Sequence, residues 1–152
     1  MGEIEFLYHY TSMMHWEQIQ KSGYLKLTPS NLLKPQNPKI IVQEDGIRNV
    51  VDETDSYKPV VWLTHDELAQ NHAMSKWKEE IQIAIRYDKS KHHWWIDWKD
   101  KNRMNKNWFK KLTCHGEKYG SWYVCEEIIP LSEVVFVKNL KTNEIIYKQG
   151  EL

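Results

Sequence analysis

Apolar and polar residues alternate along several short stretches of the chain, and this period of two residues predicts β-strands. The clearest alternation covers residues 80–87 (EIQIAIRY), where three isoleucines and a tyrosine are separated by polar or small residues. Residues 60–64 (VVWLT) form a continuous apolar run, which is typical of a buried strand. The remaining predicted strands cover residues 4–10, 24–28, 121–129 and 134–138, and residues 140–147 form a closing hairpin that turns at Thr142 and Asn143.

A helical period follows the first of these strands and predicts a helix over residues 12–22. Thr11 and Ser12 carry hydroxyl groups suited to its N-terminal cap, and Gly23 supplies its C-terminal stop. Two further helices are predicted at residues 66–77 and 101–112. The predicted irregular pieces are a turn or short helix at 29–31, an aromatic-rich extended piece at 92–98, and a long connection with three prolines at 33–59. Connections of that length in a small domain are usually functional or mobile.

The order of the elements is a helix near the front, short strands throughout and a strand-rich end, which favours an α+β fold. We expect two small packed, mostly antiparallel sheets with a helix after the first strand. The chain has 152 residues, of which 41% are hydrophobic and 28% charged. This size and composition fit one domain over residues 1–152 that builds a core without disulfides or metals.

Charge and cysteine usage narrow the functional classes. Lys and Arg number 21, as do Asp and Glu, so no net charge draws the protein toward nucleic acid or anionic lipid. Residues 99–111 (KDKNRMNKNWFKK) are basic, and such a run is either the solvated face of a helix or a nucleic-acid contact. Cys114 and Cys125 lack metal-ligand spacing and are expected to be free thiols. With no signal-peptide pattern and no apolar run of membrane-spanning length, we expect a cytoplasmic protein without a membrane partner.

Side chains capable of chemistry gather at three predicted strand ends, residues 9–11 (His-Tyr-Thr), 62–64 (Trp-Leu-Thr) and 126–127 (Glu-Glu). A histidine fixed at a strand end can hydrogen-bond a ligand, and an aromatic ring offers a face for stacking. A carboxylate can accept a ribose hydroxyl or stabilise a developing cation. These parts suit cleavage of the N-glycosidic bond of NAD, in which the ribose acquires oxocarbenium character as nicotinamide leaves.

The same three segments resemble ADP-ribosyltransferases of the His-Tyr-Glu type, and their pattern is closest to the DNA-modifying toxin branch. The opening LYHYTSMMHWEQIQKSGYLKLTPS is similar to the family's first strand, which ends in His-x-Thr-Ser, and to the helix and glycine that follow it. The run VVWLT resembles the second functional strand, with Trp62 where tyrosine is usual. The segment CEEIIPLSEVVFVK resembles the strand of the catalytic glutamate, and aligning Pro130 gives that place to Glu126. The resemblance covers about half of the chain.

This resemblance implies an NAD-dependent mono-ADP-ribosyltransferase that acts on a macromolecular acceptor, either protein or nucleic acid. It implies that His9 and Glu126 are catalytic, with His9 holding the nicotinamide-side ribose and Glu126 stabilising the oxocarbenium ion. It implies that Trp62 stacks on nicotinamide. The other expected cofactor-binding residues are Tyr10, Thr11, Thr64 and Arg86, the last of these as a ligand of the pyrophosphate.

Several alternatives stay open at this level. Side chains alternate along a strand, so only one of Glu126 and Glu127 would face the ligand. Arg86 fits a surface ion pair as well as a pyrophosphate contact. Tyr10 stands where the family has a small residue, and Trp62 stands where it has tyrosine. These two departures favour a catalytically silent module on the same fold that binds a nucleotide or a protein.

Two further expectations complete the sequence analysis. The pair at residues 92–93 (His-His) has no additional ligands at suitable spacing, so no metal site is predicted. The small size fits a toxin-like effector or a protein of a phage or other mobile element.

Overall fold

A computed structural model describes residues 4–28, 39–42, 48–51, 58–67, 80–113 and 119–149. In chain order, its helices and strands are β1 (Phe6–Thr11), α1 (Met13–Ser22), β2 (Tyr24–Leu25), β3 (Lys39–Val42), β4 (Arg48–Val51), β5 (Val61–Thr64), β6 (Ile81–Arg86), β7 (His92–Trp94), α2 (Trp95–Lys101), α3 (Lys106–Leu112), β8 (Trp122–Cys125), β9 (Ile129–Pro130), β10 (Val134–Asn139) and β11 (Glu144–Lys148). The predictions that fall outside the described residues are the turn at 29–31, most of the connection at 33–59, the helix beyond residue 67, and Cys114.

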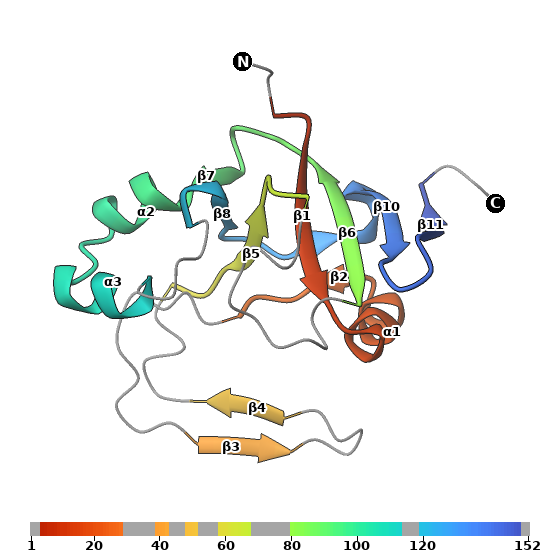
Figure 1. Cartoon of the computed structure of the whole chain (residues 1–152), viewed down its shortest axis with the longest axis horizontal. Coiled ribbons are helices and arrows are strands. Elements are labelled where there is room, and N and C mark those ends of the chain that lie inside the picture. The colour runs from red at the N-terminus through yellow and green to blue at the C-terminus, as the bar shows by residue number, and fades with distance from the viewer. Residues whose placement is uncertain are drawn as a thin grey trace.

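The fold is α+β and is dominated by one antiparallel sheet of seven strands in the order β11-β10-β6-β1-β5-β8-β7 (Figure 1). Two ribbons of two strands each, β2-β9 and β3-β4, accompany it. The expectation of two small packed sheets was wrong, since one large sheet holds most of the strands. β6 pairs with β1 along one edge and with β10 along the other, so hydrogen bonds join the N-terminal and C-terminal strands into a single sheet.

β6 is the predicted strand that the structure bears out most fully. Ile81, Ile83 and Ile85 point to one face and are completely buried. Gln82 and Ala84 point to the other face and are also buried, because the sheet is covered on both sides at this strand. Alternation therefore located the strand, while burial of Gln82 followed from its central place in the sheet.

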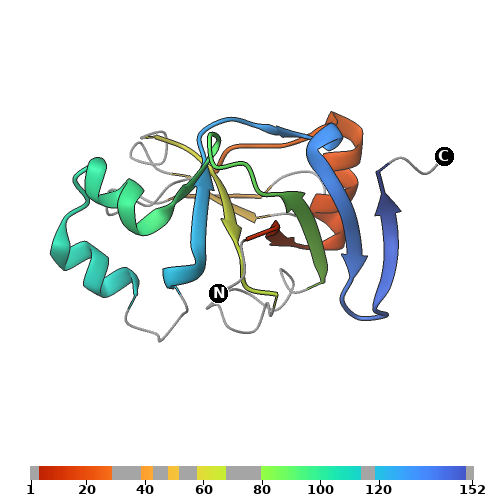
Figure 2. The ribbon, with the colours of Figure 1, turned by 90° about the horizontal axis from the view of Figure 1, so that it is seen from above.

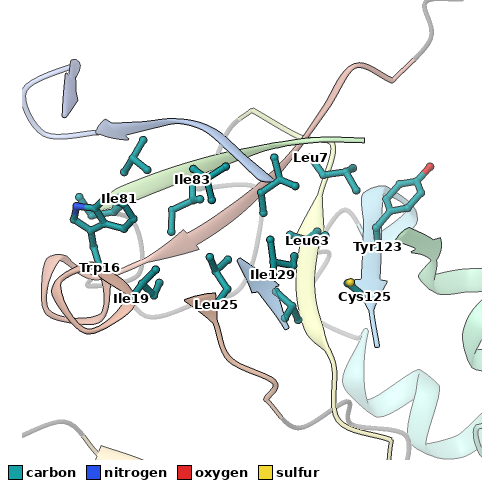
Figure 3. Packing of buried hydrophobic residues seen from close by; sticks show 14 residues of the cluster. Leu7, Trp16, Ile19, Leu25, Leu63, Ile81, Ile83, Tyr123, Cys125 and Ile129 are labelled. Carbon is teal, nitrogen blue, oxygen red and sulfur yellow. The ribbon is translucent and has the colours of Figure 1, made fainter. Parts of the chain in front are cut away.

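The first face of the sheet, here called the α1 face, carries the largest core cluster (Figure 3). Trp16 and Ile19 of α1 pack there against the isoleucines of β6. The helix begins as predicted, since the Ser12 hydroxyl accepts a hydrogen bond from the His15 backbone N–H at 3.1 Å. It ends at Gly23, whose φ of 88° lies in the left-handed region that favours glycine.

The opposite face, here called the α2 face, holds a second cluster in which Trp95 and Trp98 of α2 pack against Val60 and Val124. Figure 2 shows α1 and the pair α2 and α3 at opposite ends of the sheet. Each of the described helices is too short and too polar to cross a membrane.

The helix predicted at residues 101–112 is α3, which ends at Leu112 as expected but begins only at Lys106, while Lys101 ends the separate helix α2. α2 extends from Trp95 to Lys101, and burial of its two tryptophans holds it against the sheet. Arg103 then adopts a left-handed φ of 59°. The Asn105 side chain accepts hydrogen bonds from two backbone N–H groups and starts α3. The predicted extended piece at 92–98 is β7 followed by the first turn of α2.

The strand predicted at residues 121–129 was too long. β8 stops at Cys125, and the chain bends at Glu126 and Glu127 before β9 pairs with β2. The bend carries Ile129 into the core on the α1 face, where Leu25 also packs. Burial of an apolar side chain therefore ended the strand earlier than the alternation indicated.

The remaining predictions differ little from the structure. The strand predicted at 24–28 is β2 followed by an isolated bridge at Thr28. The C-terminal hairpin consists of β10 and β11 and turns at residues 140–143. Asn143 takes the left-handed φ of 64° that asparagine tolerates in tight turns.

Candidate functional site

β1 and β5 lie side by side in the sheet but separate along their length. β1 pairs with β6 at six positions, whereas the only register pair between the described residues of β1 and β5 joins Tyr8 to Thr64. Two residues earlier on β5, the imidazole Nδ1 of His9 lies 2.8 Å from the backbone carbonyl oxygen of Trp62. A side chain thus replaces the backbone ladder at this point. We call this divergence of β1 and β5, bounded by His9 and the Trp62 backbone, the fork.

The segment after α1 closes the far end of the fork. Val60 and Thr28 exchange two backbone hydrogen bonds of 2.7 and 2.9 Å, and the Thr28 hydroxyl also lies 3.2 Å from the Val60 carbonyl oxygen. Along one edge of β5, Thr64 therefore pairs with β1, the Trp62 carbonyl bonds the His9 ring, and the preceding residue Val60 bonds Thr28. The sequence analysis missed this role of Thr28, although its place at the end of a predicted strand was the available signal.

The tautomer of His9 follows from its partner. A carbonyl oxygen only accepts, so the Nδ1 of His9 carries the proton that makes this hydrogen bond. In the neutral ring Nε2 is then a hydrogen-bond acceptor, which can accept a hydrogen bond from a hydroxyl group. The ring is half-buried, and the bond to the neighbouring strand fixes its orientation.

Strand alternation assigns His9 and Thr11 to the α1 face together with Leu7, which belongs to the core cluster of that face. Thr11 is 5% exposed, and Ser12 beside it caps α1. The fork therefore opens next to the beginning of α1. His9, Thr11 and the first turn of the helix are the part of the predicted site that the structure brings together.

Tyr10 points to the α2 face, away from His9. Its hydroxyl donates to the Asp66 carbonyl oxygen at 2.8 Å and accepts from the Gln82 side-chain amide at 3.1 Å. Burial raises the pKa of this phenol, so Tyr10 stays protonated. The large side chain thus occupies the opposite side of β1 from His9.

Trp62 also points to the α2 face, so the expectation that its ring stacks on a nicotinamide whose ribose is held by His9 does not fit this position. Its ring centroid lies 5.6 Å from that of Trp122 and 6.0 Å from that of Trp95. Thr64 belongs to the same face, where its hydroxyl is 2.7 Å from the Ser121 hydroxyl and accepts from the Asp66 backbone N–H. The reason is that the His9 ring contacts the backbone of Trp62 and not its side chain. Alternation along β5 turns the Trp62 side chain to the other face of the sheet.

Arg86 lies at the opposite end of β1 from the fork. It pairs in register with Phe6, and its guanidinium carbon is 5.6 Å from the centroid of the Phe6 ring. The side chain is exposed and belongs to the α2 face. The expectation of a pyrophosphate ligand beside His9 does not fit this position, which is three residues away along β1 and on the other side of the sheet.

The two glutamates after β8 differ in their partners. The Trp98 indole N–H donates to the Glu126 carboxylate at 2.7 Å, which turns Glu126 toward α2. The backbone of Glu127 instead hydrogen-bonds the thiol of Cys125, which is buried on the α1 face. Burial raises the pKa of that thiol, and the hydrogen bond from Glu127 opposes the rise. Both carboxylates are exposed and lie in a bend, so strand alternation no longer decides between them.

Cys125 and His92 face each other across β8 and β7, a juxtaposition that the sequence did not indicate. The Nδ1 of His92 accepts from the Asp88 backbone N–H at 3.0 Å, and burial lowers the pKa of the imidazole. His92 is therefore a neutral ring that holds the turn before β7. Among the described residues, no three His, Cys, Asp or Glu side chains are grouped as metal ligands.

The geometry thus consists of an imidazole at a divergence of two strands, a hydroxyl on the same face, and a pair of carboxylates beyond the end of β8. In comparisons with protein-family models, with curated proteins and with solved structures, nothing matched this chain.

Proposed function

We propose that this chain is an NAD-dependent mono-ADP-ribosyltransferase whose ligand binds at the fork. The observation that carries the proposal is the hydrogen bond between the His9 ring and the Trp62 carbonyl, at a place where β1 and β5 are no longer paired in register. The segment around His9 is also the one that most resembles the first strand of the His-Tyr-Glu transferases. Breaks in a strand ladder are places where a ligand can reach groups that a closed sheet would occupy.

His9 has the hydrogen-bonding form that this role needs. With Nδ1 bound to the Trp62 carbonyl, Nε2 is the acceptor of the neutral ring. A ribose hydroxyl is the matching donor, and the fixed ring would orient the sugar for loss of nicotinamide. Thr11 lies two residues further along β1 on the same face and provides a second, buried polar group next to the fork.

A carboxylate from the bend after β8 would stabilise the oxocarbenium ion. β8 lies two strand spacings from β1, which is about 10 Å, so one nucleotide is long enough to reach from His9 toward this bend. The alignment on Pro130 favours Glu126, but its bond to Trp98 holds it toward the α2 face. We propose Glu127 instead, since its backbone bonds the thiol of Cys125, which belongs to the α1 face as His9 does.

Trp62 has no stacking role in this proposal, since its ring packs with Trp95 and Trp122. That packing favours a second candidate function, a catalytically silent module that binds a nucleotide or a protein at the fork. The two candidates share the ligand site and differ in chemistry. A toxin-like effector of a phage or another mobile element would fit the first, with a protein or nucleic acid as acceptor.

The test is a titration with NAD by calorimetry, followed by an assay for released nicotinamide. The transferase predicts both binding and release, and His9→Ala should weaken binding by about 1–2 kcal/mol through the lost hydrogen bond. His93→Ala is the matched control, because His93 is a half-buried histidine of β7 away from the fork. Binding without nicotinamide release would establish the silent module. Absence of NAD binding by the wild type at millimolar concentration would contradict both.

A further inference from the structure

Positive charge is concentrated on the two helices that project from one end of the sheet (Figure 1). This α2–α3 arm, residues 95–112, carries six cations and two carboxylates, a net charge of +4. The chain has 21 of each kind, so the rest holds 15 cations and 19 carboxylates, a net charge of −4. The neutral total therefore hides a strong separation of charge between the arm and the rest of the protein.

Five of the six cations of the arm are exposed. They are Lys101, Arg103, Lys106, Lys110 and Lys111. Within the described part of the chain, none of the five forms an ion pair. Elsewhere, Lys91 in the turn before β7 pairs with Glu133 at 3.0 Å, and Lys141 in the turn between β10 and β11 pairs with Glu80 at 2.9 Å. The arm thus presents cations that the described fold leaves uncompensated.

The sixth cation, Lys99, has a structural role that holds the arm together. Its side chain is 12% exposed and its Nζ lies 2.8 Å from the Asp100 carboxylate. The same Nζ lies 4.4 Å above the ring of Phe109, which packs on Trp95. Contact between α2 and α3 through this cation and these rings makes the arm a fixed surface, on which the five exposed cations keep their relative positions.

Arg103 is placed at the corner between the two helices at an unfavourable backbone angle. Its φ of 59° is in the left-handed region, where glycine or asparagine costs less. An arginine there presents an exposed guanidinium at the tip of the arm. A purely structural corner would be more stable with a smaller residue, so the cation itself is the feature that the position supplies.

We propose that the α2–α3 arm binds the phosphate backbone of a nucleic acid. Arrays of exposed Lys and Arg bind polyphosphates by releasing condensed counterions, and arginine adds bidentate contacts to phosphate. A lipid surface fits less well, because none of the described side chains of the arm is an exposed large hydrophobic that could enter a bilayer. Exposed amides of Asn105 and Asn107 between the cations add hydrogen-bond donors suited to phosphate and sugar oxygens.

The experiment measures binding of labelled 20-nucleotide single-stranded DNA, duplex DNA and RNA by fluorescence anisotropy in the absence of NAD. If all five cations contact phosphates, the slope of log K against log salt for duplex DNA should be about −4.5. Lys110→Gln with Lys111→Gln should reduce that slope by about 2 and weaken binding at least about tenfold at moderate salt. Lys26→Gln with Lys89→Gln removes two exposed lysines outside the arm and should leave binding unchanged.

Several results would overturn the proposal. One is no binding of any of the three nucleic acids at low salt, and another is equal loss of binding in the two double variants. Preferential binding to polyglutamate or to phosphatidylserine vesicles would assign the arm to an acidic protein or to a membrane instead. Since NAD is absent throughout, failure here leaves the function proposed for the fork untouched, and failure of NAD binding leaves the arm untouched.

Discussion

The two faces of the sheet near the fork use the same strands in different ways. On the α2 face, the rings of Trp62, Trp95 and Trp122 lie against each other with centroids 5.1 to 6.0 Å apart, and Trp95 is completely buried. On the α1 face, His9 is half-buried and bonds a backbone carbonyl that has left the β1 ladder. The two faces of the paired strands β1 and β5 therefore differ, with aromatic packing on one side and a side-chain hydrogen bond to the backbone on the other, as the period of two allows.

The largest effect is expected from Trp95, at the centre of the aromatic cluster. Trp95→Ala should lower the free energy of unfolding by about 3–5 kcal/mol, because it leaves a large cavity between α2 and the sheet. Among the described residues the Trp95 indole N–H has no hydrogen-bond partner, so Trp95→Phe should cost clearly less. Urea denaturation measures both variants. Trp94→Ala, at a 39% exposed neighbour, is the control, and a cost equal to that of Trp95→Ala would contradict the comparison of faces.

The second prediction concerns which face of the sheet carries the carboxylate of the proposed transferase. If the carboxylate belongs to the α1 face, Glu127→Gln should reduce nicotinamide release by about 100- to 1000-fold while NAD binding persists, since only charge stabilisation in the transition state is lost. Glu126→Gln should then change turnover little, although it weakens the contact with Trp98. The reverse ranking in a steady-state assay would return the catalytic role to Glu126, as the alignment on Pro130 implies.

The third effect concerns Thr64, which the sequence assigned to the cofactor and the structure places among buried polar groups. Thr64→Val should destabilise the fold by about 1–3 kcal/mol, because the Ser121 hydroxyl and the Asp66 N–H lose a buried partner. Thr64→Ser retains the hydroxyl and should recover most of that stability. NAD affinity measured on both variants should equal that of the wild type. A selective loss of affinity in Thr64→Val, with stability retained, would restore Thr64 to the site.

The smallest effect appears only at alkaline pH and tests the polar groups that cover the α2 face. Burial, aided by the Glu67 carboxylate, raises the pKa of Tyr8 from 10.0 to about 12. Because the folded protein holds this proton more tightly than the unfolded chain, the associated stability is complete below pH 10.0 and is lost as the pH rises to about 12. Tm measured across this range should fall less steeply in Tyr8→Phe. An identical slope in wild type and variant would show that Tyr8 titrates as an exposed phenol.

The comparison of faces also explains which parts of the site could be predicted. His9, Thr11 and the helix after them were found from local signals, a strand that ends in a hydroxyl and a capped helix that stops at Gly23. Trp62 and Thr64 were assigned to the ligand because the apolar run VVWLT resembles the second functional strand of the transferases. Only the pairing of β5 with β1 and β8 decides which way those side chains point.

By itself, the sequence determined the local elements: the alternation of β6, the hydroxyl cap and glycine stop of α1, and the left-handed turn at Asn143. These depend on side-chain spacing and on backbone preferences that act within a few residues. The tertiary structure alone decided the order of the strands, the divergence of β1 from β5, and the end of β8 at Cys125. Each of these depends on contacts between residues far apart in the chain. Burial of Ile129 outweighs the local preference to continue the strand, and burial of Trp95 starts a helix where the local pattern predicted an extended segment.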